Sequence, residues 1–209
     1  MKIIQPSVEI LTPINGEEIL KMIEQCGRTC YKSEDKITED SAHRFVKNII
    51  QSGHEAVIEH FNITIKFICD RGVSHEIVRH RLASYCQEST RYCNYSQDKF
   101  GEEITVIKPC YLKEGSSSYD LWRRSCELSE MYYFSLLNKN CTPQEARAVL
   151  PNSLKTEVVM TANLREWRYF FKLRTAKAAH PQMREVAIMA LNELKSKIPI
   201  IFDGVEVVP

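Results

Sequence analysis

The chain has 209 residues, with 28 Lys or Arg against 27 Asp or Glu, so its formal net charge is +1. A general nucleic-acid-binding protein usually carries a clear basic excess, and this near-neutral balance argues against that class. The hydrophobic share of 44% is typical of a globular protein, and no apolar run approaches the roughly 18 residues of a transmembrane helix, so we expect one globular domain over residues 1–209 and no membrane partner.

The first third of the chain predicts a strand, two helices and a second strand. A short strand is expected over residues 8–11, and a helix over residues 17–25 that ends just before Gly27. Thr38 is the expected N-cap of the next helix, which runs to residue 51. Residues 61–68 alternate between apolar and polar side chains, which predicts a strand with one buried face.

The rest of the chain predicts short strands among longer helices. Ser74 is expected to cap a short helix through Arg81, and the polar stretch over residues 84–99 has no usable periodicity. The remaining expected elements are a strand at 104–107, helices at 119–137 and from 143 to about 150, a strand at 157–160, and helices at 163–173 and 182–195. Because the order is not a regular βαβ repeat, we predict an α+β fold whose mixed or antiparallel sheet is flanked by helices.

The most unusual segment is the polar stretch over residues 79–92, which holds three arginines, a histidine and two serines. A guanidinium presents a planar fork of donors that suits phosphate, and the amide of Gln87 suits the donor–acceptor edge of a pyrimidine base. Basic residues at a helix C-terminus also satisfy the helix dipole without binding any ligand. From composition alone, both a nucleotide site and a solvated basic helix end stay open.

The histidines do not predict a metal site. Residues 53–60 contain two histidines and two glutamates, but H-E-x-x-H spacing fails because position 58 is Ile. His75 and His80 are five residues apart and would face different ways on a helix. The eight cysteines form no C-x-x-C pair, and the first residues lack the apolar run of a signal peptide, so we expect a cytoplasmic protein with reduced thiols.

The predicted helix over residues 163–173 has an apolar face that ends in a cation. Helical spacing places on this face Leu164, Trp167, Phe170, Phe171 and Arg174. The aromatic residues are most simply core. A cation that enters a buried face needs an anionic or polar partner, so Arg174 is a candidate functional residue, and Arg147 raises the same question.

At these residues the chain resembles the flavin-dependent thymidylate synthases. Their signature of R-H-R, seven residues and a serine is met by Arg79, His80, Arg81 and Ser89. The resemblance continues, in chain order, through the block at 53–60, Ser84, Arg91, Tyr92, Arg147 with Leu150-Pro151, Asn163 to Arg165, and Leu173-Arg174. It spans roughly residues 45–195, and the ordered set is far more specific than the R-H-R triplet alone.

The resemblance implies an α+β subunit that assembles as a homotetramer with active sites between subunits. It implies a methyltransferase that converts dUMP to dTMP by reductive methylation. Methylenetetrahydrofolate would supply the carbon, NADPH would reduce the bound FAD, and the reduced flavin would pass hydride to the pyrimidine adduct. The family uses no cysteine nucleophile.

The resemblance also implies roles for individual residues. Arg174 would be catalytic, because a fixed cation near the pyrimidine ring stabilises negative charge as the ring is activated. The implied dUMP-binding residues are Glu76, Arg79, Gln87, Ser89, Arg91, Arg147 and Arg174. The implied FAD contacts are His54, Glu59, Arg79, His80, Arg81, Asn163 and Tyr169. Some members carry Asn-Glu where this chain has Cys86-Gln87, so a carboxylate near the nucleotide is replaced by an amide.

A non-catalytic nucleotide- or RNA-binding module that stacks bases on tyrosines near residues 79–91 is the main alternative. The neutral overall charge and the apolar setting of Arg174 count against it. The two hypotheses predict different colours for the purified protein, since a flavoprotein is yellow and a binding module is colourless.

Overall fold

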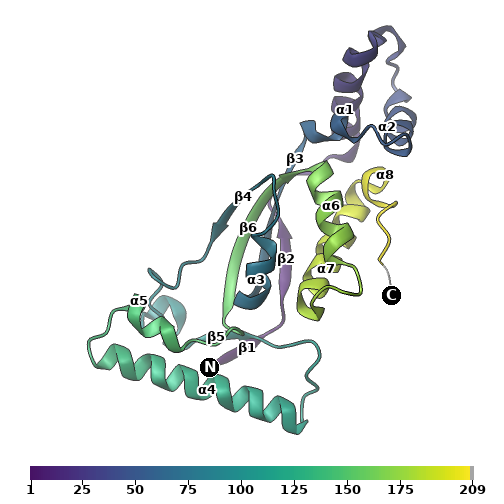
Figure 1. Ribbon diagram of the computed structural model, residues 1–209. Helices are drawn as coiled ribbons and strands as arrows, with labels where there is room; N and C mark the ends of the chain where they lie inside the picture. Colours follow the sequence, from purple (N-terminus) through teal and green to yellow (C-terminus); the bar gives the residue numbers. More distant parts are fainter. Residues whose placement is uncertain (208–209) are drawn as a thin grey trace. The chain divides into compact units, whose positions relative to one another are not determined.

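The computed structural model describes residues 1–207, apart from the side chain of Lys99. By its internal packing the chain divides into two compact units. The first unit comprises Met1–Ser7, Phe67–Arg79 and Cys86–Val158, and the second comprises Val8–Lys66, His80–Tyr85 and the chain from Val159 onward. The mixture of helices and strands confirms the predicted α+β class (Figure 1). The single domain over residues 1–209 stays a prediction.

Four strands form a sheet in the order β2-β3-β6-β4, and each of them changes unit along its length. Their bounds are Ser7–Ile10 for β2, Asn62–Asp70 for β3, Lys155–Asn163 for β6 and Ala83–Gln87 for β4. In β3 the side chains of Ile63, Ile65 and Phe67 are fully buried and alternate with half-buried or exposed ones, which confirms the alternation predicted there. The strand β4 was not predicted.

The first unit builds its core against a long helix. It contains β1 (Lys2–Ile4), which pairs in parallel with β5 (Thr105–Ile107), and the helices α3 (Arg71–Ile77), α4 (Ser117–Asn138) and α5 (Pro143–Ala146). Two 3-10 turns, Asp98–Phe100 and Arg147–Val149, complete it. Tyr133 of α4 and Val106 of β5 are fully buried in its apolar core.

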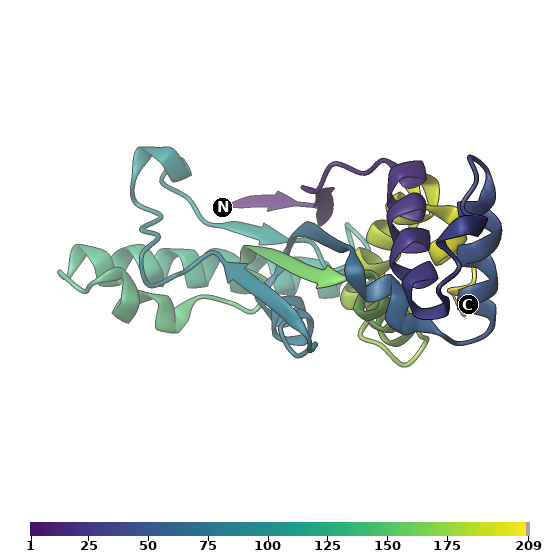
Figure 2. The ribbon, with the colours of Figure 1, turned by 90° about the horizontal axis from the view of Figure 1, so that it is seen from above.

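The second unit is mostly helical. It contains α1 (Gly16–Tyr31), α2 (Ser41–Gln51), α6 (Leu164–Arg174), α7 (Pro181–Lys197), α8 (Pro199–Phe202) and 3-10 turns at Glu34–Lys36 and Glu55–His60. The helices α1, α2 and α8 lie side by side in both ribbon views (Figures 1 and 2). Trp167 of α6 is fully buried, stacks on Phe171 at 5.6 Å between ring centroids, and donates its indole N–H to the carbonyl of Ile63.

The helix α1 runs past the expected stop at Gly27. It ends at Tyr31, and Lys32 takes the left-handed conformation with φ of 47°. A Cβ atom at position 27 would lie 2.6 Å from Cε1 of Phe45 in α2. Gly27 therefore permits the close approach of the two helices, and the prediction that it ends α1 is wrong.

Two predicted N-caps are also wrong. The helix α2 begins at Ser41 rather than after Thr38, and the Ser41 hydroxyl accepts the Thr38 N–H at 2.9 Å. The helix α3 begins at Arg71, where the buried carboxylate of Asp70 accepts the N–H of Val73 at 2.7 Å. The hydroxyl of Ser74 instead donates to the carbonyl of Arg71 within the helix.

Candidate functional site

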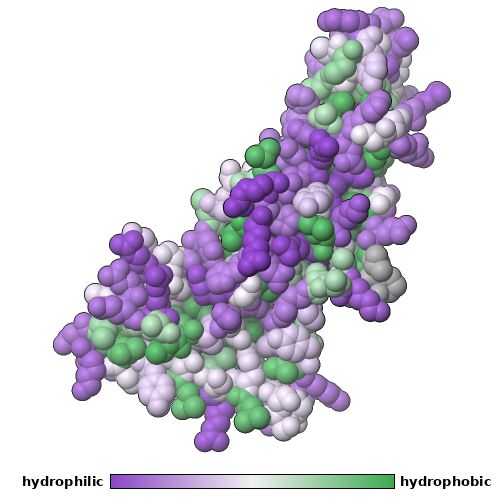
Figure 3. Space-filling view, viewed as in Figure 1, coloured by the Kyte–Doolittle hydropathy of each residue, from purple (hydrophilic) through white to green (hydrophobic). Residues whose placement is uncertain are grey.

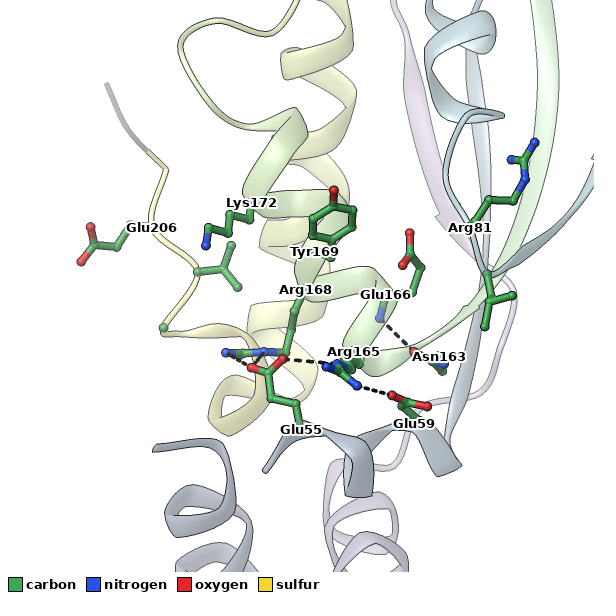
Figure 4. A pocket seen from close by; sticks show the side chains of 13 residues that line it. Glu55, Glu59, Arg81, Asn163, Arg165, Glu166, Arg168, Tyr169, Lys172 and Glu206 are labelled. Carbon is green, nitrogen blue, oxygen red and sulfur yellow. Dashed lines mark hydrogen bonds and ion pairs between the residues drawn. The ribbon is translucent and has the colours of Figure 1, made fainter. Parts of the chain in front are cut away.

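A pocket of about 900 Å³ lies in the second unit beside α6 (Figure 4). Four of its lining residues were predicted as FAD contacts, namely Glu59, Arg81, Asn163 and Tyr169. The others are Glu55, Leu82, Arg165, Glu166, Arg168, Lys172, Gly204, Val205 and Glu206. The pocket therefore brings together residues that are up to 151 positions apart, from Glu55 to Glu206.

The helix α6 presents cations to this pocket because its apolar residues occupy the opposite face. The side chain of Asn163 accepts the N–H of Glu166 at 2.8 Å and caps the helix. Arg165, Arg168 and Lys172 then recur at i, i+3 and i+7, which places them on one face. Trp167 and its aromatic neighbours face the core. Asn163 thus has a structural role in addition to its predicted contact with FAD.

Two glutamates of the 3-10 turn Glu55–His60 hold two of these arginines (Figure 4). Arg165 pairs with Glu59 at 2.6 Å, and Arg168 donates to Glu55 at 3.1 Å and to the carbonyl of Ile201. A guanidinium has five N–H donors, so a carboxylate on one edge leaves other donors for a ligand. The carboxylates therefore orient the arginines without using up their binding capacity.

His80 connects the pocket to Arg174. The imidazole is 3% exposed and tilts against the ring of Phe170 at 4.8 Å between centroids. Nε of Arg174 donates to Nε2 of His80 at 2.9 Å, and Nδ1 of His80 lies 3.2 Å from a carboxylate oxygen of Glu166. A cation at the end of an apolar helical face needs a polar partner, and His80 is one for Arg174.

The protonation state of His80 follows from these contacts. Burial, followed by the charge of Arg174, lowers the pKa of His80 to about 4, so the ring is neutral at pH 7. Burial raises the pKa of the Glu166 carboxyl. Because the Nε–H of Arg174 can only donate, Nε2 of His80 is an acceptor, and the ring proton lies on Nδ1 facing Glu166.

The predicted phosphate-binding arginines lie in the first unit and contact neutral partners. Nε of Arg91 donates to the amide oxygen of Gln144 at 3.1 Å, and Nη1 of Arg147 donates to the hydroxyl of Thr90 at 3.4 Å. The segments 89–91 and 144–147 therefore meet within this unit. Both arginines are exposed, so their charge is available to an anion.

The amide of Gln87 is oriented by two hydroxyls of the same unit. Its Nε2 atom donates to Ser74 at 2.9 Å and to Thr156 at 3.3 Å, and both of these residues are fully buried. The amide carbonyl is left to accept a hydrogen bond. Ser89 accepts the N–H of Arg91 at 3.3 Å, so it shapes the loop that carries this arginine.

The remaining predicted residues are placed as follows. His54 is exposed in the second unit, where its ring nitrogen lies 3.1 Å from the hydroxyl of Tyr31, outside the pocket lining. Tyr169 is 52% exposed and lines the pocket. In the first unit, Glu76 of α3 is half-buried and Arg79 is exposed.

The pocket residues that were not predicted from the sequence include Glu55, Glu166, Arg168 and Lys172. The spacing of Arg165, Arg168 and Lys172 opposite the aromatic face of α6 is a signal that could have found the two cations. The role of Glu166 depends on a contact with His80, 86 residues earlier, for which the sequence carries no signal.

Within the described residues, no group of three His, Cys, Asp or Glu side chains is placed to hold a metal ion. Over the same residues, none of the helices combines the length and the apolarity that crossing a membrane would require. All eight cysteines are free thiols.

A family model described as thymidylate synthase complementing protein matches residues 14–200. The flavin-dependent thymidylate synthase of Pyrococcus furiosus is 32% identical over 177 residues, which cover 84% of this chain and 72% of that protein. The enzyme of the same name from Corynebacterium glutamicum is 31% identical over 218 residues, which cover 96% of this chain and 84% of that protein.

Solved structures share the fold. The UMP/dUMP methylase PolB from Streptomyces cacaoi, bound with 5-Br dUMP, superposes with a TM-score of 0.77. The match covers 97% of this chain and 96% of that chain at 21% identity. This likeness extends the α+β assignment to almost the whole chain.

Proposed function

Because the chain belongs to the flavin-dependent thymidylate synthase family, we propose that it converts dUMP to dTMP, with FAD as its cofactor, methylenetetrahydrofolate as carbon donor and NADPH as reductant. The observation that carries the proposal is the family match over residues 14–200, which contains every residue predicted for the site. The geometry of the two units supports individual roles within this reaction.

The α6 pocket is suited to a flavin nucleotide. Its volume of about 900 Å³ falls within the roughly 300–1,000 Å³ of cofactor pockets. Arg81, Arg165 and Lys172 offer donors to a diphosphate, and the exposed ring of Tyr169 offers a stacking surface. The lining holds four cationic side chains and four glutamates, namely Glu55, Glu59, Glu166 and Glu206, so the diphosphate would be bound by directed hydrogen bonds more than by net charge.

Arg91 and Arg147 are suited to the phosphate of dUMP. Their contacts within the first unit are to the neutral groups of Gln144 and Thr90, so neither contact compensates the positive charge. A phosphate that replaced or joined these contacts would gain charge-assisted hydrogen bonds. The carbonyl of Gln87 would accept a hydrogen bond from the base or the sugar.

Arg174 is suited to polarising the pyrimidine ring. When bound, the flavin supplies hydride to the one-carbon adduct of the ring. The chain's own part is to hold a cation where negative charge develops, and a half-buried guanidinium beside a buried imidazole has little freedom to turn away. Because Arg174 is half-buried, water screens its charge less than it screens the charge of an exposed side chain.

We extend the proposal to assembly and compartment. The exposed side chains of Leu121, Leu128 and Tyr132 share one face of α4, and apolar side chains appear over this helix in Figure 3. Exposed apolar faces mark protein contacts, so this face supports association of the chain with further copies. The family resemblance suggests a homotetramer whose sites draw residues from more than one chain. The eight free thiols support a reducing compartment, the cytoplasm.

The proposed activity is tested with the purified protein. We expect a yellow protein with flavin absorbance, light scattering of a tetramer, and dTMP formation that requires dUMP, methylenetetrahydrofolate and NADPH together. A colourless protein that fails to bind added FAD would contradict the proposal and favour the nucleotide-binding module.

A further inference from the structure

Both ring nitrogens of His80 are engaged by side chains of the second unit. Nε2 accepts from Arg174 at 2.9 Å, and Nδ1 donates to Glu166 at 3.2 Å. The ring is almost completely buried. The backbone carbonyl of His80 accepts hydrogen bonds from Nη1 of Arg81 at 2.7 Å and from the hydroxyl of Tyr85 at 3.0 Å. His80 is therefore held on its backbone and at both ends of its ring.

The partners of the His80 ring select its tautomer. A neutral imidazole has one N–H and one lone pair, so an acceptor at Nδ1 and a donor at Nε2 both favour the tautomer with its proton on Nδ1. The carboxylate of Glu166 can only accept while it is ionised, and it thereby favours the tautomer whose lone pair faces Arg174. With the opposite tautomer, an N–H on Nε2 would face the N–H on Nε of Arg174, and two donors would meet.

We propose that Glu166 is a positioning residue that acts through His80 to fix the guanidinium of Arg174. This inference rests on the proposed function of Arg174 at the pyrimidine ring. It assigns Glu166 no contact with the reacting atoms, and it gives His80 a role that is independent of its predicted contact with FAD. The same logic operates at metal centres, where a carboxylate orients a histidine ligand through its second nitrogen.

Two substitutions separate hydrogen-bond acceptance from charge. Glu166→Ala removes the acceptor, whereas Glu166→Gln keeps an acceptor oxygen of similar reach and removes the charge. Neither change disturbs the N-cap of α6, because Asn163 bonds the backbone N–H at this position. Glu17→Ala is a matched control, since Glu17 lies 2.7 Å from Nε2 of His43 in an exposed carboxylate–histidine pair of the same unit.

The first measurement reads the tautomer directly. Long-range ¹H–¹⁵N spectra of the full-length protein saturated with FAD, labelled at its six histidines, should show His80 protonated on Nδ1 at pH 7. The His80 signals are assigned by their loss in His80→Gln. We expect the Nδ1–H form to lose population in Glu166→Ala and to persist in Glu166→Gln and in Glu17→Ala. An unchanged His80 tautomer in Glu166→Ala overturns the inference.

The second measurement is kinetic. Glu166→Ala should lower turnover at saturating FAD and dUMP by about 10- to 100-fold, by analogy with the loss of a carboxylate that orients a metal-bound histidine, while dUMP affinity changes little. Glu166→Gln should recover most of that turnover, and Glu17→Ala should match the wild type. Equal losses in the Ala and Gln variants, or a loss of dUMP affinity as large as the loss of turnover, contradict the inference.

The two measurements also separate this inference from the proposed function. A wild-type protein that forms no dTMP contradicts the proposed reaction. The tautomer spectra of the same protein still decide whether Glu166 orients His80 toward Arg174.

Discussion

Two arginines of the first unit and two of the second unit have partners of opposite kinds. In the first unit, Arg91 and Arg147 are exposed and contact the neutral side chains of Gln144 and Thr90. In the second unit, Arg165 and Arg168 are held by carboxylates. An arginine with a neutral partner keeps its charge for a ligand, whereas one with a carboxylate partner is oriented but compensated. Partner chemistry therefore separates arginines that attract an anion from arginines that shape a pocket.

Arg174 also has a neutral partner, the imidazole of His80, but it is half-buried, and its removal should have the largest effect. The neutral ring of His80 orients the guanidinium of Arg174 without adding a negative charge beside it. Arg174→Ala should lower turnover, because the transition state loses about 2.7–4 kcal/mol of stabilisation by analogy with the loss of an oxyanion donor. The affinity for dUMP should change little. Single-turnover kinetics and dUMP titration measure the two effects. Lys177→Ala, at an exposed position, is the control. Near-normal dTMP formation by Arg174→Ala would contradict the role assigned to Arg174.

Removing Arg91 should have the next largest effect, and it should act on binding. Arg91→Ala should weaken dUMP binding by about 1.5–3 kcal/mol, the cost of a lost charged hydrogen bond. Calorimetric titration of dUMP at two salt concentrations measures this loss and its electrostatic origin. Arg123→Ala is a matched control, because Arg123 is exposed in the same unit and pairs with Glu127. Unchanged dUMP affinity in Arg91→Ala contradicts the assignment.

A smaller effect is expected at Asn163, and it should fall on stability. Asn163→Ala removes the cap of α6 and should lower the free energy of unfolding by about 0.5–2 kcal/mol, whereas Asn163→Asp keeps an acceptor oxygen and should retain it. Urea denaturation of the FAD-free protein measures the difference. Equal stability of the Ala and Asp variants argues that the side chain does not serve as a cap.

The smallest effect is expected at the exposed pair of Glu59 and Arg165. Both side chains are largely solvent-accessible, so water and salt screen their attraction. Glu59→Gln should leave the thermal midpoint within experimental error of the wild type, and FAD affinity should not fall, because Arg165 gains freedom to bind the diphosphate. A large loss of FAD affinity would instead support Glu59 as a direct contact of the cofactor.

Elements with one fully buried face were predicted well. In β3 the burial of Ile63 and Ile65 follows the alternation of apolar and polar residues in the sequence. In α6 the helical spacing of Trp167 and Phe171 likewise marks the buried face. The strand β4 was missed because it stands last in the sheet order, and its residues alternate between half-buried and exposed. An edge strand of this kind has no buried face to impose an apolar pattern.

Residues of the candidate site were predictable only where they belong to a sequence motif. The arginines and His80 were found because they fall in an ordered set of sequence blocks, which the family match over residues 14–200 supports. Glu166 and the true cap of α3, Asp70, were missed for a common reason. Their roles are set by hydrogen-bond geometry, and several nearby polar residues, such as Ser74, satisfy the same sequence rule.

The packing of Gly27 against Phe45 has a consequence for how this chain can vary. Replacing a glycine inside a helix by alanine usually stabilises it by about 0.5–1 kcal/mol, yet here the added methyl group would meet the Phe45 ring at 2.6 Å. The two positions are therefore expected to covary among relatives: a side chain at position 27 becomes acceptable only after the ring at position 45 is reduced. That exchange also removes the aromatic face over which the Arg28 guanidinium lies at 4.5 Å, so neighbouring position 28 should change in the same lineages.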